Sequence, residues 1–236
     1  MFVRFGGCDY RCTKCDSLHA VIPAAVKANA SYLTAEEIAD RIIPRAKESS
    51  TPWVTLSGGN PCMWDLSKLI HLLHGAGLGV AVETQGTLAP DWLRLCQMVV
   101  ISPKSPGMGE KFEPEKLVKF LQATLPKKPH LPKPAVALKV VVFSQQDIDF
   151  AIDVTEVAAR VPDAVTPGML FLSLGNHAPP LLEGTELVTE TPPDFRLQLL
   201  QQYRILAEEV AEDPRITHFR ILPQLHVLAW ANESEK

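Results

Sequence analysis

Three cysteines near the start of the chain, Cys8, Cys12 and Cys15, have the spacing C-x3-C-x2-C. Three thiolates on one short loop can ligate three irons of a cubane 4Fe-4S cluster and leave the fourth iron without a protein ligand. An iron of that kind can bind and activate a small molecule. The spacing therefore predicts an iron-sulfur site whose open iron carries out chemistry.

Two other interpretations of these cysteines stay open from the spacing. His19 follows Cys15 closely enough to complete a Cys3His set, which is a familiar tetrahedral zinc site. The chain has five cysteines in 236 residues, and this odd, small number argues against a disulfide framework. The other two, Cys62 and Cys96, match no ligand spacing, and we expect them to be buried as small apolar residues. The spacing favours a cluster and leaves zinc as the alternative.

The composition is that of an ordinary globular protein. Hydrophobic residues make up 46% of the chain, which is enough for one domain with a sizeable core. The formal net charge is -4, whereas proteins that bind nucleic acids usually present a basic face. No apolar stretch approaches the roughly 20 residues that a membrane-spanning helix needs. We therefore expect a cytoplasmic protein with one domain over residues 1–236 and with no nucleic-acid or membrane partner.

Short β-branched runs alternate with amphipathic runs of helical period, a pattern typical of βα units around a parallel sheet. Strands are expected at residues 2–5, 53–56, 78–83, 99–101, 137–143, 169–174 and 219–222. Thr34 and Glu37 form a capping box that opens a helix, and Pro44 is expected to kink or end it. Further helices are expected between Asp65 and Gly75 and at residues 90–95, 114–124, 147–161 and 195–210. Residues 176–193, rich in Pro and Glu, are expected to form a lid or an exposed loop.

Small or polar residues follow nearly every predicted strand. In a βα barrel the loops after the strands meet on one face, and ligands bind there. These loop residues are 8–17, 57–60, 83–86, 102–104, 173–176 and 223–226. Among them, Gly58 and Gly59 can form a simple turn or an exposed backbone edge that pairs with the amino group of a ligand. The face at the carboxyl ends of the strands is therefore the predicted site.

The cysteines after the first strand and the Gly-Gly motif after the second resemble the radical S-adenosylmethionine (SAM) superfamily. Seven segments, which follow one another along the whole chain, also resemble one branch of it, the 7-carboxy-7-deazaguanine synthase family. They are FVRFGGCDY (2–10), CDS (15–17), SGGNP (57–61), ETQGT (83–87), ISPK (101–104), LKVV (138–141) and LPQLH (222–226). The resemblance implies an α/β fold, a partial (β/α) barrel of the radical SAM type with parallel strands and outer helices.

Membership of that family would imply a ring contraction in the biosynthesis of queuosine and related 7-deazapurines. The substrate would be 6-carboxy-5,6,7,8-tetrahydropterin and the product 7-carboxy-7-deazaguanine, with ammonia lost. SAM on the open iron would be cleaved to a 5′-deoxyadenosyl radical that takes a hydrogen from pterin C6, and SAM would then be regenerated. A magnesium ion would assist, and a flavodoxin or a ferredoxin would donate the electron.

The resemblance also implies which residues hold the cofactors. Cys8, Cys12 and Cys15 would ligate the cluster, and the hydroxyl of Ser17 would ligate magnesium unless it is only a loop hydroxyl. The residues expected to line the SAM pocket are Lys14, Cys15, Asp16, Gly58, Gly59, Asn60, Glu83, Ser102, Pro103, Lys104, Ser173 and Asn176.

Three residues are expected to bind the pterin. The guanidinium of Arg4 suits the substrate carboxylate, because it can form two parallel hydrogen bonds with it. Ser57 lies where the family has a hydroxyl near the pterin, and His226 could donate a hydrogen bond to the substrate. The plainer alternatives are a surface arginine for Arg4 and a satisfied core histidine for His226.

The chain departs from the family's pattern at its start. Family members carry a segment before the first strand, including a Gln-Gly-Glu stretch that contacts the pterin, whereas here Met1 comes immediately before that strand. We expect a truncated first strand and substrate pocket, or else a start assigned at an internal methionine. An exposed sheet edge would favour a homodimer. The alternative functions are an inactive truncated homologue and a different radical SAM enzyme, such as a glycyl-radical activase.

Overall fold

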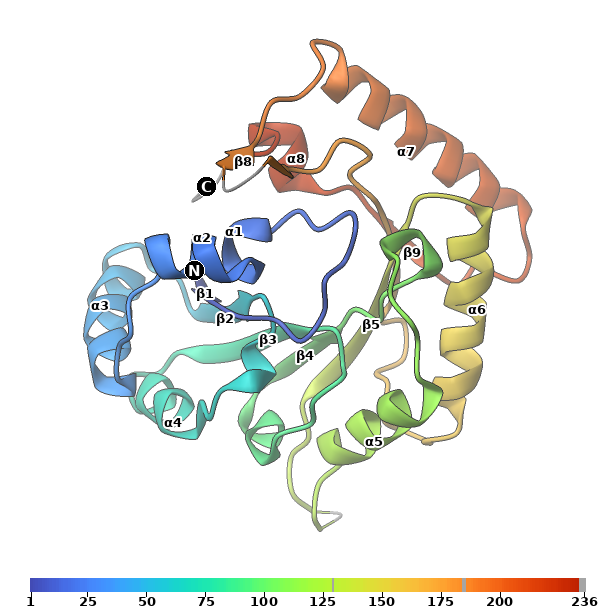
Figure 1. Cartoon of the computed structure of the whole chain (residues 1–236). Coiled ribbons are helices and arrows are strands. Elements are labelled where there is room, and N and C mark those ends of the chain that lie inside the picture. Colours follow the sequence, from blue (N-terminus) through green and yellow to red (C-terminus); the bar gives the residue numbers. More distant parts are fainter. Residues whose placement is uncertain (129, 184–185, 234–236) are drawn as a thin grey trace.

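Seven parallel strands form the central sheet of the protein in a computed structural model that describes residues 1–128, 130–183 and 186–233 (Figure 1). Their order across the sheet is their order along the chain. The strands are β1 (Phe2–Phe5), β2 (Trp53–Gly58), β3 (Gly79–Thr84), β4 (Met98–Ile101), β5 (Ala135–Val142), β6 (Leu170–Leu174) and β9 (Arg220–Leu222). Every predicted strand is confirmed, and the observed ends lie within two residues of the predicted ones.

Helices connect the strands and surround the outer face of the sheet (Figure 1). Parallel strands joined by right-handed crossovers in sequential order place all connecting helices on the same face and curl the sheet into a partial barrel. These helices are α3 (Ala35–Glu48), α4 (Ser67–Gly75), α5 (Pro114–Thr124), α6 (Gln145–Ala159) and α7 (Phe195–Glu212). Within the described residues β1 and β9 are the two outer strands of the sheet, so the barrel is open. The predicted α/β fold is confirmed.

Several short elements were not predicted, because segments this short show no clear helical or strand period. They are α1 (Leu18–Val21), α2 (Pro23–Asn29), α8 (Leu225–Trp230) and the 3-10 helices η1 (Pro61–Met63) and η3 (Pro106–Met108). The short helix expected at residues 90–95 is confirmed as the 3-10 helix η2 (Asp91–Leu95). The predicted lid segment contains an antiparallel hairpin of β7 (Leu181–Glu183) and β8 (Glu186–Val188). Gly184 and Thr185, which belong to that segment, lie outside the described residues.

The first long helix, α3, begins as predicted and ends later than predicted. Thr34 Oγ1 accepts a hydrogen bond from Glu37 N at 3.2 Å, and the Glu37 carboxylate accepts one from Thr34 N at 2.7 Å. Pro44 does not end this helix as predicted, because α3 continues to Glu48. Pro44 and Asp40 are both exposed, so water can reach the carbonyl group that loses its hydrogen bond.

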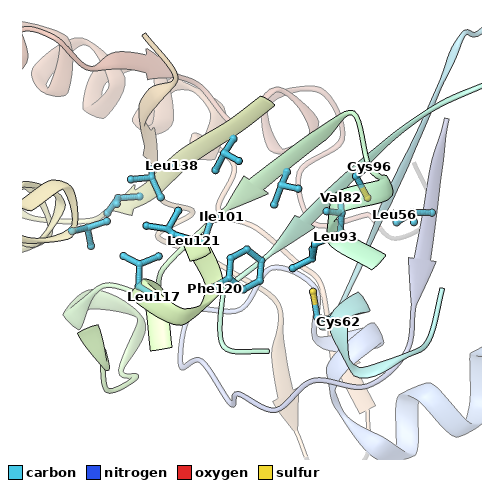
Figure 2. Packing of buried hydrophobic residues seen from close by; sticks show 14 of the residues in the cluster. Leu56, Cys62, Val82, Leu93, Cys96, Ile101, Leu117, Phe120, Leu121 and Leu138 are labelled. Atoms are coloured by element: carbon cyan, nitrogen blue, oxygen red, sulfur yellow. The ribbon is translucent and has the colours of Figure 1, made fainter. Parts of the chain in front are cut away.

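The core lies between the sheet and the outer helices. Figure 2 shows Phe120 and Leu121 of α5 close to Ile101 of β4, and all three side chains are fully buried. Cys62 and Cys96 lie among these apolar residues with exposed fractions of 6% and 3%, which confirms their predicted burial. All five cysteines are free thiols, so the chain has no disulfide framework.

None of the helices in the described part of the chain has both the length and the hydropathy required to cross a bilayer.

Replacing the buried ring of Phe120 is expected to destabilise the fold strongly. Phe120→Ala removes a fully buried aromatic side chain and leaves a cavity, so the free energy of unfolding should fall by about 3–5 kcal/mol. Urea denaturation of the reduced protein measures this change. The neighbouring exposed residue gives the control: Lys119→Ala should change the free energy of unfolding by less than about 0.5 kcal/mol. Equal losses in both variants would contradict the assigned packing.

Candidate functional site

A cleft of about 690 Å³ lies at the carboxyl ends of the strands. Its walls come from the cysteine loop (residues 6–17), from the strand ends and from α8. The predicted site residues that line it are Arg4, Cys8, Cys12, Lys14, Cys15, Asp16, Ser17, Ser57, Gly58, Gly59, Glu83, Ser102, Lys104, Ser173, Asn176 and His226. Two predicted SAM-binding residues, Asn60 and Pro103, do not line this cleft. The fold thus collects residues that are far apart in the sequence around one space.

The three clustered cysteines are thiols that resist ionisation in the protein alone. Burial raises the pKa of Cys12 to about 12 and that of Cys15 to about 11. Burial is also the main cause that raises the pKa of Cys8. The positive charge of Lys104 opposes this effect at all three thiols. Because a thiol must lose its proton to ligate a metal, this site favours thiolates only when bound metal adds positive charge.

The donor set fits a cluster better than a single zinc ion. In the described ranges, no three His, Cys, Asp or Glu side chains are close enough together to hold one metal ion. A zinc site made by Cys8, Cys12, Cys15 and His19 would require every ligand atom within about 2.3 Å of one ion. A four-iron cluster is larger, and each thiolate binds a different iron. Three thiols that line one cleft therefore suit the cluster.

The carboxylate of Asp9 fixes the cysteine loop to the ends of β2 and β3. Its Oδ1 accepts hydrogen bonds from Asn60 Nδ2 at 2.8 Å and from Gln85 Nε2 at 2.5 Å. Its Oδ2 accepts a hydrogen bond from Thr87 Oγ1 at 2.6 Å. Gln85 Nε2 also lies 3.5 Å from the sulfur of Cys8. One carboxylate thereby sets the position of the first cysteine relative to the sheet.

The Asn60 side chain binds the cysteine loop and does not line the cleft, and its expected role at SAM stays a prediction. The side chain is fully buried. Besides its bond to Asp9, its Oδ1 accepts hydrogen bonds from Cys62 N at 3.2 Å and from Thr84 Oγ1 at 2.9 Å. Asp9 and Cys62 do not line the cleft, whereas Thr84 does, so Asn60 can act on a ligand through the residues that it holds.

The segment after β4 contacts the cysteine loop at its other end. The backbone N–H of Thr13 donates to Met108 O at 3.0 Å. Arg11 N donates to Glu110 Oε1 at 2.5 Å, and Arg11 Nη1 donates to Cys8 O at 2.7 Å. The loop between Cys8 and Cys15 is therefore held from two sides, although it contains no regular secondary structure.

Glycine is required at positions 58 and 59 because residues 5–7, which precede the cysteines, lie very close to this backbone. Gly59 N donates to Phe5 O at 3.0 Å, and Asn60 N donates to Gly7 O at 2.8 Å. A Cβ atom on Gly59 would lie 2.1 Å from Gly7 O, and one on Gly58 would lie 2.1 Å from Phe5 O. Gly58 also has a φ of +139°, which L side chains rarely adopt. Since the N–H groups of Gly59 and Asn60 are already bonded, the carbonyl oxygens of this edge are the groups that suit a ligand donor.

A chain of polar contacts runs from β1 to α8 across the end of the cysteine loop. Arg4 Nη1 donates to Ser17 Oγ at 3.1 Å, and Ser17 Oγ donates to Asp16 Oδ1 at 2.9 Å. His226 Nε2 lies 3.7 Å from Asp16 Oδ2. The His226 side chain is 56% exposed, so its interpretation as a core histidine is wrong. The predicted magnesium and substrate residues are therefore neighbours.

Asp16 is ionised because its neighbours outweigh its burial. Burial alone would raise the pKa of this carboxyl. The imidazole of His226, 3.7 Å away, together with Ser17 and Lys104, acts in the opposite direction and holds the pKa well below its usual range. The cysteine loop thus ends in a fixed negative charge that faces the cleft.

Glu83 and Lys139 form an ion pair across the inner surface of the sheet. Glu83 lies on β3 and Lys139 on β5, and Lys139 Nζ is 3.5 Å from Glu83 Oε1. The two side chains are 35% and 26% exposed, and both line the cleft. At this distance the carboxylate and the ammonium keep hydrogen-bonding capacity for a ligand.

Two lysines of the predicted SAM pocket have partners in their neighbouring loops. Lys14 Nζ lies 4.1 Å from the ring centroid of Phe143, which is the distance of a cation–π contact. Lys104 Nζ donates to Ser102 Oγ at 3.2 Å. Both ammonium groups therefore stay at the cleft and do not extend into solvent.

Asn176 lines the cleft, but its amide group binds the C-terminal segment. Its Nδ2 donates to Asn232 Oδ1 at 2.8 Å, and its Oδ1 accepts from Ala178 N at 2.9 Å. Asn232 Nδ2 in turn donates to Ala178 O at 2.8 Å. Ser173, at the end of β6, is buried with an exposed fraction of 5%. Asn176 therefore fixes the chain around Ser173 and the C-terminal wall of the cleft.

Comparison with known proteins gives the family. A family model described as a 4Fe-4S single cluster domain matches residues 1–78. A 7-carboxy-7-deazaguanine synthase from Bacillus subtilis is 34% identical over 234 residues, which cover 99% of this chain and 88% of the relative. The chain belongs to the 7-carboxy-7-deazaguanine synthase family. A relative of the same name from Pyrobaculum aerophilum is 27% identical and covers 100% of this chain and 88% of that protein.

Solved structures agree with the fold expected of a member of this synthase family. A crystal structure of QueE from Escherichia coli has a TM-score of 0.57 and 20% identity, and covers 94% of this chain and 84% of that chain. The structure of Streptococcus suis SuiB bound to S-adenosylmethionine has a TM-score of 0.52 and 12% identity, with coverages of 96% and 51%. At these identities the likeness concerns the fold alone.

Four residues that hold or line this synthase-family site were missed from the sequence. Gln85 lies in a strand-end loop that the sequence did single out, so its position could have been used. Lys139 is the one charged residue within the apolar run of β5, which was a usable signal. Asp9 also lies in a loop that the sequence singled out, residues 8–17, whereas Phe143 gave no comparable signal, because only the folded chain shows what its side chain contacts.

Removing the Asp9 carboxylate is expected to loosen the cysteine loop. Asp9→Ala leaves the donors of Asn60, Gln85 and Thr87 without their acceptor. The free energy that holds the loop in place should fall by about 2 kcal/mol, the net contribution of one hydrogen bond to a charged group. After anaerobic reconstitution, the variant should retain clearly less iron per chain than the unaltered protein. Asp65→Ala is the control, because the exposed Asp65 carboxylate bonds to Ser67 and, within the described ranges, to no residue of the cysteine loop. Equal iron contents in the two variants would contradict the anchoring role of Asp9.

Proposed function

We propose that this chain binds a 4Fe-4S cluster and SAM in the cleft and converts 6-carboxy-5,6,7,8-tetrahydropterin to 7-carboxy-7-deazaguanine, with loss of ammonia. The observation that carries the proposal is the placement of Cys8, Cys12 and Cys15 in the wall of a cleft otherwise formed by polar strand ends. The family to which the chain belongs favours this reaction over that of a glycyl-radical activase.

The cysteines and Lys104 would hold the cluster. Cys8, Cys12 and Cys15 would each bind a different iron as a thiolate, and the Lys104 ammonium would reduce the cost of the negative charges. When bound, the cluster and SAM supply the one-electron chemistry that removes hydrogen from the substrate. The hydrogen bonds of Asp9 and Thr13 keep the loop in place during that step.

SAM would lie between the cysteine loop and the strand ends. The carbonyl oxygens of Gly58 and Gly59 suit a ligand amino group, since the neighbouring N–H groups are already bonded. The Lys104 ammonium suits the ligand carboxylate, and the Glu83 carboxylate suits ribose hydroxyl groups. Further residues of the cleft would complete the pocket, namely Lys14, Asp16, Ser102 and Ser173. Asn60, Pro103 and Asn176 would support it indirectly.

The pterin would lie toward β1 and α8. Arg4 and Ser57 are paired in the register of β1 and β2, so their side chains are neighbours at that end of the cleft. The guanidinium of Arg4 can bind the substrate carboxylate, and the hydroxyl of Ser57 can bind a ring heteroatom. His226 would donate or accept a hydrogen bond from the opposite wall while Asp16 fixes its orientation.

Magnesium would bind at Ser17. Mg²⁺ prefers oxygen ligands and keeps several waters, so one hydroxyl with substrate oxygens and water is a sufficient ligand set. Ser17 Oγ lies beside the ionised Asp16 carboxylate, which adds favourable negative charge. To reach the cation, Ser17 would exchange its hydrogen bond from Arg4, and Arg4 would then be available to the substrate.

The cellular setting is part of the same proposal. A flavodoxin or a ferredoxin would donate the electron that reduces the cluster. Five free cysteines are compatible with a reducing compartment such as the cytoplasm. We also propose that residues 1–236 act as one domain, and that the outer edge of β1 pairs in a homodimer.

Anaerobic reconstitution tests the proposed function. The chain, loaded with iron and sulfide and reduced, should turn SAM, Mg²⁺ and 6-carboxy-5,6,7,8-tetrahydropterin into 7-carboxy-7-deazaguanine and ammonia, detected by mass spectrometry. Cys12→Ala should lose the brown colour and all product, because two protein thiolates cannot hold the cluster in its open-iron form. A loaded protein that makes no deazaguanine, or a colourless one that holds one zinc, would overturn the proposal.

Removing the Ser17 hydroxyl is expected to weaken magnesium binding. Ser17→Ala should raise the Mg²⁺ concentration for half-maximal activity about tenfold, the effect of about 1.4 kcal/mol. Ser17→Thr keeps a hydroxyl and should stay close to the unaltered protein. As a further control, Ser57→Ala should weaken pterin binding and leave the Mg²⁺ dependence unchanged. An unchanged Mg²⁺ dependence in Ser17→Ala would reject Ser17 as a ligand.

A further inference from the structure

Asp147 is a fully buried carboxylate that does not line the cleft. It lies in the first turn of α6, behind the loops that follow β4 and β5. Its Oδ1 accepts a hydrogen bond from Gly107 N at 2.8 Å. Its Oδ2 accepts hydrogen bonds from Phe143 N at 2.9 Å and from Ser144 N at 3.0 Å. A single side chain thus binds the backbone of two separate loops.

These bonds exceed what helix capping requires. A capping box needs only the reciprocal bonds between Ser144 and Asp147, which α6 has. The bond to Gly107 joins α6 to η3 in another βα loop. A Cβ atom on Gly107 would lie 2.7 Å from Asp147 Oδ2, so the carboxylate is in tight contact with that backbone. Asp147 therefore fixes the two loops relative to each other.

Both loops then contact the part of the cysteine loop between the second and third cysteines. Met108, next to Gly107, accepts the hydrogen bond from Thr13 N at 3.0 Å. Asp147 also binds the backbone N–H of Phe143, and Lys14 Nζ lies 4.1 Å from the centroid of the Phe143 ring. Thr13 and Lys14 are the two residues between Cys12 and Cys15. The positions of two of the three thiols therefore depend on the loops that Asp147 holds.

We infer that Asp147 is a positioning residue for the cluster, acting through Met108 and Phe143 on residues 12–15. The inference rests on the proposed function in one respect, that Cys12 and Cys15 are cluster ligands. If the carboxylate is lost, both loops are freed at their bases, and the geometry of these two thiolates is no longer fixed. The cluster should then lose iron faster and show a changed electronic environment.

The chain offers a matched control in its other capping box. Asp147→Asn and Glu37→Gln each remove the charge from the carboxylate of a capping box and keep the side-chain size. Among the described residues, Glu37 makes its hydrogen bonds with Thr34 at the start of α3, and it does not line the cleft. A loss of helix capping alone should therefore leave the cluster unchanged in both variants, whereas a loss of cluster positioning should change it only in Asp147→Asn.

Three measurements on reconstituted protein separate these roles. They are the rate of iron loss to a chelator, the electron paramagnetic resonance spectrum of the reduced cluster, and the urea midpoint of unfolding. Asp147→Asn should lose iron about tenfold faster, the size expected for one charged hydrogen bond, and its spectrum should differ from that of the unaltered protein. Glu37→Gln should match the unaltered protein in both cluster measurements. An iron-loss rate and a spectrum of Asp147→Asn that match Glu37→Gln would overturn the inference.

Phe143→Leu decides the question if Asp147→Asn does not fold. It keeps the carboxylate and removes the ring that contacts Lys14 and His177, so iron should again be lost faster than from the unaltered protein. A normal rate would overturn the inference in that case. None of these measurements uses the pterin, so a chain that behaves as expected here but makes no deazaguanine would refute the proposed reaction alone. A chain that binds no cluster would refute both.

Discussion

The hydrogen bonds of Asp9 are the constraint on which the site depends. The cysteine loop has no regular secondary structure, so ordering it costs conformational entropy that backbone pairing within the loop does not offset. Asp9 offsets this cost by accepting hydrogen bonds from three side chains that follow two neighbouring strands. The contact requires the close approach of the chain to β2, which in turn requires Gly59. The cysteines face the cleft because these conditions are met together.

Much of the fold was predictable, because buried parallel strands have a strong sequence signal. The runs around Val80, Val99 and Val140 are β-branched and lie between turn residues, and each is a strand. The location of the site followed from the same signal, because the carboxyl ends of parallel strands meet on one face. The end of α3 was not predictable by local rules, since Pro44 is tolerated at an exposed position. Short elements such as α8 have too few residues to show a period.

The individual side chains of the site were less predictable than its location. A strand-end position predicts that a residue is near the cleft, but not that its side chain points into it. Asn60 is such a residue, because its amide turns away to hold the cysteine loop. Lys139 shows the reverse case. It lies inside β5, and yet its side chain lines the cleft and pairs with Glu83 on β3. Side-chain direction depends on tertiary contacts that no local pattern contains.

Two carboxylates outside the cleft, Asp9 and Asp147, hold the residues that face it. Asp9 binds the side near Cys8, and Asp147 binds the two loops that contact residues 12–15. A carboxylate suits this task, because its two oxygens can accept several hydrogen bonds from different segments in a fixed geometry. The thiols and the Lys104 ammonium are then not needed to hold the loops together. Their donor capacity and charge stay available for metal and ligands, which a site that assembles around a cluster requires.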